Sequence, residues 1–277
     1  APLWPADPPA RALLALLRGQ DHAGGAAVDG NVLAALAARL WLEPRLAVRA
    51  ADNRRVPPAI HRRWLDARCA TAARNLLFQR EEENLLRALQ RAGVEAVPLK
   101  GTSLARMLGD LASRPVTDID LAIRARDVAR AGEALHRLGY SIRLPAALLA
   151  HRAFLAGTDA HTSEVTCSRE EAGTVLALEL HWKSLSLPEA EIWRGVQTYS
   201  PSGVRTLGIE HYFLFLCAHA ADGGWAGLRW LCDLAEFLTL LRHRLDAAHC
   251  VQLAGRAGLQ RAVGVTLELL DAFFDVR

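Results

Sequence analysis

Residues 59–92 contain no glycine or proline, which makes them the longest such stretch in the chain, and apolar side chains recur in it with helical periodicity. Pro57 and Pro58 lie at its start, where proline is tolerated in a first helical turn, and Gly93 follows as a plausible C-cap. The pattern predicts one long helix, or two helices separated by a kink. Its charged segment QREEEN, residues 79–84, is predicted to be a solvated face.

The pattern changes after Gly93 and changes again at Gly208. The middle part alternates short apolar runs with amphipathic runs, which is typical of strands alternating with helices. We expect strands at 94–101, 117–123, 140–144 and 174–182 and helices at 102–110 and 125–139, while 158–169 is ambiguous. The part before the long helix predicts two helices over 10–56, and the last part predicts four, over 209–221, 225–243, 246–257 and 259–274.

This order predicts an α+β fold: a small mixed β-sheet with helices on one side, flanked by N-terminal and C-terminal helical subdomains. We expect boundaries at 1–92, 93–207 and 208–277, with a substrate cleft between the sheet edge and the C-terminal helices.

Composition narrows the class of protein. A net charge of +3 over 277 residues does not indicate a nucleic-acid or membrane surface. Five scattered cysteines without CxxC spacing argue against a disulfide framework or a zinc site. The longest apolar run, 212–221, is too short to span a bilayer, and the first residues lack the basic start of a signal peptide. We expect a cytoplasmic protein.

Two aspartates stand one residue apart in the predicted strand 117–123. Alternate residues of a strand share a face, so the carboxylates of Asp118 and Asp120 would lie about 6–7 Å apart. Their repulsion would cost roughly 2–3 kcal/mol at an effective dielectric constant near 20. A divalent cation removes this cost, and aligned aspartates can hold two ions around a phosphoryl group. The alternative is an exposed edge strand with solvated acids.

A glycine turn precedes the aspartates, in PLKGTSLARML. Gly101, followed by Thr102 or Ser103 at a helix start, would present backbone N–H groups to a phosphate. Lys100 is one of two lysines in the chain, and Arg114 lies in the loop before the aspartates. Either cation could meet phosphate, or could simply be solvated.

Further candidates lie on later elements. Glu179 is a lone acid on the apolar strand LALELHW, where it could bind metal or act as a general base, or could pair with an arginine. His181 shares its face, as a substrate contact or a hydrogen-bonded core residue. The segment HAADGGWAGLRWLCD, residues 219–233, offers His219 and Arg229 for substrate, although Arg229 and Asp233 could instead form an internal ion pair.

The combination of LKGTSLARML, RPVTDIDLAI, ALHRLGY, LELHW and LCAHAADGGWAGLRWLCDLAEFL resembles the nucleotidyltransferase superfamily typified by DNA polymerase beta and the aminoglycoside nucleotidyltransferases. It is most similar to a poorly characterised bacterial nucleotidyltransferase family. The resemblance covers roughly residues 60–275. It implies that Asp118, Asp120 and Glu179 are catalytic metal ligands, and that Gly101 with Thr102 or Ser103 forms the phosphate-binding turn.

The resemblance implies an enzyme that transfers a nucleoside monophosphate, expected to be AMP from ATP, to a hydroxyl with two Mg²⁺ ions and release of pyrophosphate. The acceptor, a small molecule, peptide or protein, is not identified by the sequence. Two alternatives stay open: a catalytically idle binding module with the same fold, or a nucleic-acid nucleotidyltransferase of the tRNA type. The absence of a basic stripe speaks against nucleic acid as a partner.

Overall fold

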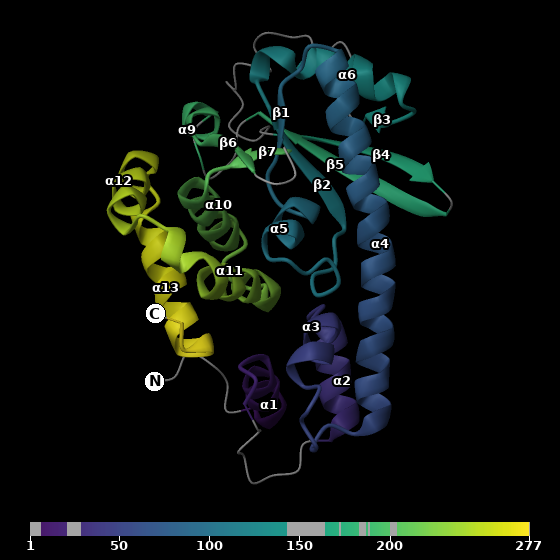
Figure 1. Cartoon of the computed structure of the whole chain (residues 1–277), viewed down its shortest axis with the longest axis vertical. Helices are drawn as coiled ribbons and strands as arrows, with labels where there is room; N and C mark the ends of the chain where they lie inside the picture. The colour runs from purple at the N-terminus through teal and green to yellow at the C-terminus, as the bar shows by residue number, and fades with distance from the viewer. Residues whose placement is uncertain are drawn as a thin grey trace.

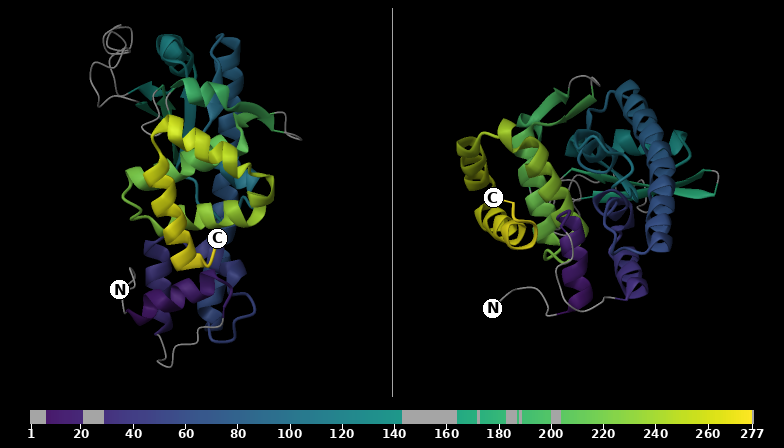
Figure 2. Two further views of the ribbon diagram at one scale, coloured as in Figure 1. Left: turned by 90° about the vertical axis from the view of Figure 1, so that its left-hand side faces the viewer. Right: turned by 60° about the horizontal axis from the view of Figure 1, so that its bottom comes forward.

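The computed structural model describes residues 7–20, 29–142, 164–171, 173–182, 187, 189–199 and 204–276. A five-stranded mixed sheet lies at one end of the molecule beside the long helix α4. The N-terminal and C-terminal helices form two further groups (Figure 1). The views in Figures 1 and 2 place the C-terminal helices on the side opposite α4. The α+β fold class predicted from the sequence is confirmed.

Helix α4, Pro58–Arg91, is one continuous helix of 34 residues, about 50 Å long. Its first half buries Ile60 and Trp64 in the core shared with the N-terminal helices, and its second half buries Phe78 and Leu85 under the sheet. The helix therefore joins the two hydrophobic cores formed by the described residues.

The prediction that residues 79–84 form a solvated face is wrong for Glu81 and Glu82, which are both buried. Glu81 accepts a 3.0 Å hydrogen bond from the Tyr140 hydroxyl and pairs with Arg169 at 2.9 Å. Burial raises the pKa of Glu82 despite its partners Thr102 and Arg106. Periodicity within the helix could not show these partners, because they come from other elements.

The sheet has the strand order β1-β2-β5-β4-β3. Its strands are β1 (Ala96–Pro98), β2 (Asp118–Ile123), β3 (Ser141–Ile142), β4 (Glu164–Glu171) and β5 (Thr174–His181). Strands β2 and β5 are parallel, and the other neighbours are antiparallel. The ambiguous segment 158–169 thus contains most of a central strand, while residues 158–163 lie outside the described part.

The two faces of the central strands differ sharply. Ile119 and Leu121 of β2 and Leu178 and Leu180 of β5 are buried in one cluster with side chains of α4 and of α6 (Val128–Arg137). Because side chains alternate across a strand, the intervening acids and His181 lie on the other face. One face of the sheet is thereby anchored, and the other is left for polar groups.

The remaining helices lie before and after the α/β part of the chain. Among the described residues before α4 there are three helices, not the two predicted: α1 (Pro8–Leu17), α2 (Gly30–Arg39) and α3 (Glu43–Arg49). The C-terminal four were predicted: α10 (Ile209–Asp222), α11 (Leu228–Leu241), α12 (Ala247–Ala257) and α13 (Gln260–Phe274).

The short helix α5 (Thr102–Met107) was predicted as well, whereas α9 (Glu189–Arg194) and the hairpin β6–β7 (Val196–Tyr199, Val204–Leu207) were not. Among the described helices, none combines the length and the apolar character that crossing a bilayer demands. The domain boundaries proposed from the sequence stay a prediction.

A buried ion network joins three parts of the chain. Asp233 of α11 pairs with Arg45 of α3 and, at 2.8 Å, with Arg114 of the loop before β2. Asp233 and Arg45 are 3 % and 2 % exposed. Burial alone would raise the pKa of Asp233, but the two guanidinium groups outweigh it and lower that pKa.

We predict that Asp233→Ala strongly destabilises the protein, because it leaves two guanidinium groups without their shared carboxylate in a buried site. Breaking such a network costs about 3–5 kcal/mol, measured by chemical denaturation. The exposed Glu268 on α13 provides the control, since Glu268→Ala should change stability by less than about 0.5 kcal/mol. Equal effects of the two substitutions would contradict a structural role for the network.

Candidate functional site

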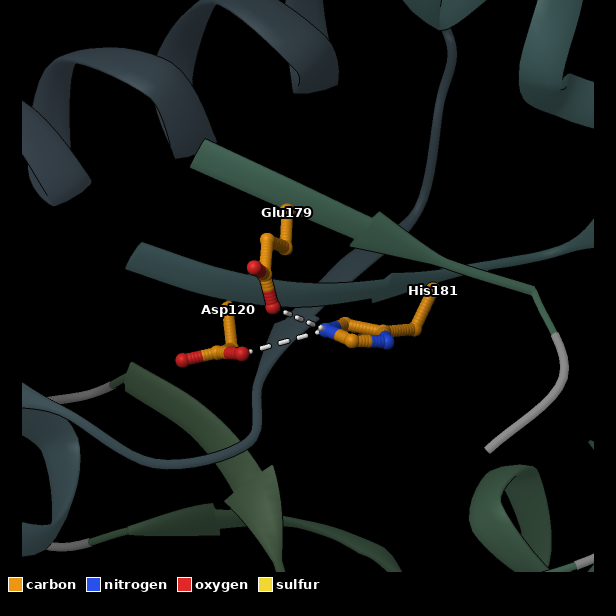
Figure 3. A group of neighbouring side chains, drawn as sticks. All are labelled: Asp120, Glu179 and His181. Atoms are coloured by element: carbon orange, nitrogen blue, oxygen red, sulfur yellow. Dashed lines mark hydrogen bonds and ion pairs between the residues drawn. The ribbon is translucent and has the colours of Figure 1, made fainter. Parts of the chain in front are cut away.

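Strand register brings the candidate acids together. In the parallel pair β2–β5, Asp120 lies opposite Glu179. In the antiparallel pair β4–β5, Glu164 lies opposite His181. Two rows of polar residues therefore adjoin on the open face of the sheet, and Figure 3 shows Asp120, Glu179 and His181 converging there.

Lys100 lies between the two aspartates. Its Nζ is 3.1 Å from Oδ1 of Asp120 and 3.6 Å from Oδ2 of Asp118. Burial lowers the pKa of Lys100, but the two carboxylates outweigh it, so the net pKa is raised. Burial raises the pKa of Asp120, but Lys100 and His181 outweigh this effect and hold the pKa below its ordinary range. The repulsion expected between Asp118 and Asp120 is thus offset by cations of the protein itself.

His181 is the second cation at this cluster. Its Nε2 lies 3.1 Å from Oδ1 of Asp120 and 3.6 Å from Oε2 of Glu179, and its Nδ1 lies 3.0 Å from Oε2 of Glu164. Burial lowers the pKa of His181, but the hydrogen bonds that its ring donates to Asp120 and Glu164 raise it to about 9. The imidazole is therefore charged at neutral pH.

Glu179 behaves differently from Asp120. Burial, and then the negative charge of Asp120, raise the pKa of Glu179 to about 7, although Lys100 acts against this. Its carboxyl group is thus balanced between its two protonation states near neutral pH, which suits proton transfer.

Ligand atoms of Asp120, Glu179 and His181 lie within 4.8 Å of one another, a grouping that could hold a metal ion. The second oxygen of Asp120, Oδ2, is buried and has no hydrogen-bond partner among the described residues. Asp118 stands beside this set, with its Oδ1 accepting a 3.1 Å hydrogen bond from Thr117. The grouping thus includes His181, which the sequence did not indicate as a ligand.

The glycine turn lies directly against the aspartate strand. Gly101 has φ +68°, and a Cβ there would lie 3.3 Å from the backbone oxygen of Asp118. The hydroxyl of Thr102 donates to Glu82 at 2.7 Å, and that of Ser103 lies 3.5 Å from Thr206 Oγ1. Both hydroxyls therefore have protein partners, which leaves backbone N–H groups as the donors of this turn.

The C-terminal candidates face the cluster from the helices. His219 has its pKa lowered to about 4, by burial first and then by Lys100, so it is neutral at pH 7. Arg229 lies over the rings of Trp41 and Trp230, 5.9 and 5.7 Å from their centres.

The ion pair suggested between Arg229 and Asp233 is not among the pairs of the described residues. Asp233 is instead paired with Arg45 and Arg114. Arg45 and Arg114, which are distant in the sequence, thus bind the Asp233 carboxylate that lies one helical turn from Arg229.

Comparison with known proteins bears on this arrangement. Residues 26–275 match the family described as "Uncharacterised nucleotidyltransferase". The chain belongs to this family. It is therefore a nucleotidyltransferase, which confirms the transferase class predicted from the motifs. No curated protein and no solved structure matches the chain. The kinship with DNA polymerase beta and the aminoglycoside enzymes stays a prediction.

Some residues of the nucleotidyltransferase site were missed or undervalued. Glu164 lies in the segment 158–169, whose structure the sequence left ambiguous. The signal in the sequence was Gly173, directly before the strand Thr174–His181. In the structure this strand pairs with Glu164–Glu171, and both have eight residues. Recognising that hairpin would have placed Glu164 opposite His181.

The nucleotidyltransferase without metal should lose thermal stability as the pH rises from about 6.5 through about 9. The His181 pKa of the folded protein, about 9, lies above the ordinary 6.5, so its charged form stabilises the fold below pH 6.5 and is lost above pH 9. The raised pKa of Glu179 acts in the same direction over a lower range, from its ordinary 4.5 to about 7. Melting temperatures measured across this range check the expectation.

His181→Gln should flatten that pH dependence, because glutamine carries no titrating charge. His243→Gln, at an exposed position of the short helix Arg242–Arg244, is the matched control and should keep the full dependence. A wild-type profile retained by His181→Gln would show that the stabilising charge lies elsewhere.

Proposed function

We propose that this protein transfers a nucleoside monophosphate, AMP from ATP, to a hydroxyl group, with release of pyrophosphate. The observation that carries the proposal is the register of Asp120 with Glu179 on adjacent parallel strands, with an unpartnered buried oxygen on Asp120. Membership of a nucleotidyltransferase family supports the class of reaction.

The donor set fits a divalent cation such as Mg²⁺. Carboxylate oxygens are its preferred protein ligands, and Asp120 and Glu179 supply them, with Asp118 adjacent. When bound, Mg²⁺ would neutralise charge on the triphosphate and make the acceptor hydroxyl more acidic. Two ions are part of the proposal, held by Asp118, Asp120 and Glu179.

The phosphate groups would meet the cations and N–H groups that surround the acids. Lys100 pairs with both aspartates, so its ammonium is already beside the position at which the triphosphate would lie. Gly101 and the backbone N–H groups of Thr102 and Ser103 form the adjoining turn. Arg114 is part of the nucleotide site in this proposal, held in place by Asp233.

In the proposed reaction the oxygen of the acceptor hydroxyl forms a bond to the α-phosphorus, and the bond from that phosphorus to the bridging oxygen breaks as pyrophosphate leaves. Glu179, on the strand beside Asp120, accepts the hydroxyl proton. His181 holds Asp120 and Glu164 in place and contacts substrate.

His219 and Arg229, on the facing helices, contact the acceptor or the nucleotide in this proposal. The acceptor class is a small molecule, a peptide or a protein side chain. The chain divides, in the same proposal, into helical parts at 1–92 and 208–277 around a catalytic core at 93–207.

We predict that ATP binds far more tightly with Mg²⁺ than without it, because Lys100 and His181, which already pair with the acids, cannot also neutralise a triphosphate. Titration calorimetry with ATP in Mg²⁺ and then in EDTA checks this. Equal affinity under both conditions would contradict the metal-dependent proposal.

Glu179→Gln should lower the rate of pyrophosphate release from ATP by about 10²-fold or more, since a positioned base contributes about that much. The melting temperature should change little, because glutamine keeps the size of the side chain. Glu170→Gln, at an exposed position of β4, is the control and should retain wild-type turnover. Turnover near wild type in Glu179→Gln would assign the base to another residue.

A further inference from the structure

Trp41 follows Leu40, the C-cap of helix α2, in a backbone conformation that glycine ordinarily adopts. Its φ is +60°, and the N–H groups of Trp41 and Leu42 donate to the carbonyl oxygens of Ala38 and Ala37 at 3.0 and 2.9 Å. This is the helix-ending pattern whose left-handed residue is commonly glycine, because any side chain there is sterically costly. The indole is 48 % exposed, so complete burial does not compensate for that cost.

The ring of Trp41 belongs to a stack of aromatic and cationic groups. Arg229 lies over both Trp41 and Trp230, and the ring of Trp230 meets His219 edge-on with 5.1 Å between ring centres. A Cβ on Gly223 would lie only 2.1 Å from the Trp230 ring. The glycine-rich turn after α10 thus admits Trp230, which supports Arg229 against Trp41.

This stack lies within electrostatic reach of the candidate active site. Arg229 lies one helical turn before Asp233 on α11, and Asp233 pairs at 2.8 Å with Arg114 of the loop that leads into Asp118. The charges of the site reach the stack accordingly: burial lowers the pKa of Arg229 and Asp118 acts against it, while burial and then Lys100 lower the pKa of His219 and Asp120 acts against them. A ligand whose charged end lies at the acids could therefore extend toward the exposed indole.

We propose that the exposed face of Trp41 is the stacking surface for the base of the nucleotide, with Arg229 fixing the plane of the indole. This inference rests on the proposed nucleotidyl transfer. The anionic part of a nucleotide belongs at the lysine and the acids, and its base is the planar part that an indole face recognises. Stacking of a base on tryptophan tolerates different bases, so Trp41 contributes affinity rather than a choice between bases.

The test compares two probes, ATP and inorganic tripolyphosphate, each titrated with Mg²⁺ into the whole chain by calorimetry. Trp41→Gly removes the ring and accepts the backbone angle, so it should fold, which thermal melting verifies. It should weaken ATP binding by about tenfold or more, as expected for loss of one base-stacking contact, and leave tripolyphosphate binding within about twofold of wild type. Trp41→Phe should retain most of the ATP affinity.

Trp193 provides the matched control, because Arg124 lies 4.2 Å from its ring centre in a comparable pair. Trp193→Ala, which also removes the ring, should leave the binding of both probes unchanged. Wild-type ATP affinity in Trp41→Gly, or equal weakening of both probes, would overturn the assignment of Trp41 to the base. If the wild-type protein binds neither probe, the proposed function fails together with this inference, whereas binding of tripolyphosphate without any preference for ATP overturns the inference alone.

Discussion

The buried carboxylate of Asp120 is the constraint on which the rest of the site depends. A lone carboxylate in such a position would be protonated or would destabilise the fold. Here Lys100 and His181 both approach the same oxygen, Oδ1, and leave Oδ2 without a hydrogen-bond partner among the described residues. The protein thus carries its own counter-charges at the position where the proposed reaction needs metal and phosphate. Binding of Mg²⁺ and ATP would give Lys100 and His181 new partners at a site that the protein already forms.

The surrounding fold keeps these groups in register. Helix α4 supports the back of the sheet with apolar side chains, while its buried Glu82 holds Thr102 and so the start of α5. Asp233 ties α11 to α3 and to the loop that leads into β2. Because the facing helices carry His219 and Arg229, this network also fixes what lies opposite the acids.

The local parts of this arrangement could be predicted from sequence, because periodicity and glycine positions are local properties. Helix α4, strand β2 and the alternation that separates Asp120 from Ile119 follow from such patterns. Strand pairing and charge complementarity are not local. The position of Glu164 opposite His181 therefore could not be predicted, nor could the buried partners of Glu81. Arg229 shows the same limit of local patterns. Its helical spacing predicted a pair with Asp233, but arginines distant in the sequence bind that carboxylate.

In the proposed reaction, the acids on the open face of the sheet hold the catalytic metal. The most direct measurement is a crystal structure with Mn²⁺ and a non-hydrolysable ATP analogue, in which anomalous scattering locates the metal. We expect a metal within bonding distance of Asp120 and Glu179, with Lys100 Nζ on the phosphates. A bound nucleotide whose metal lies away from both carboxylates would contradict this expectation.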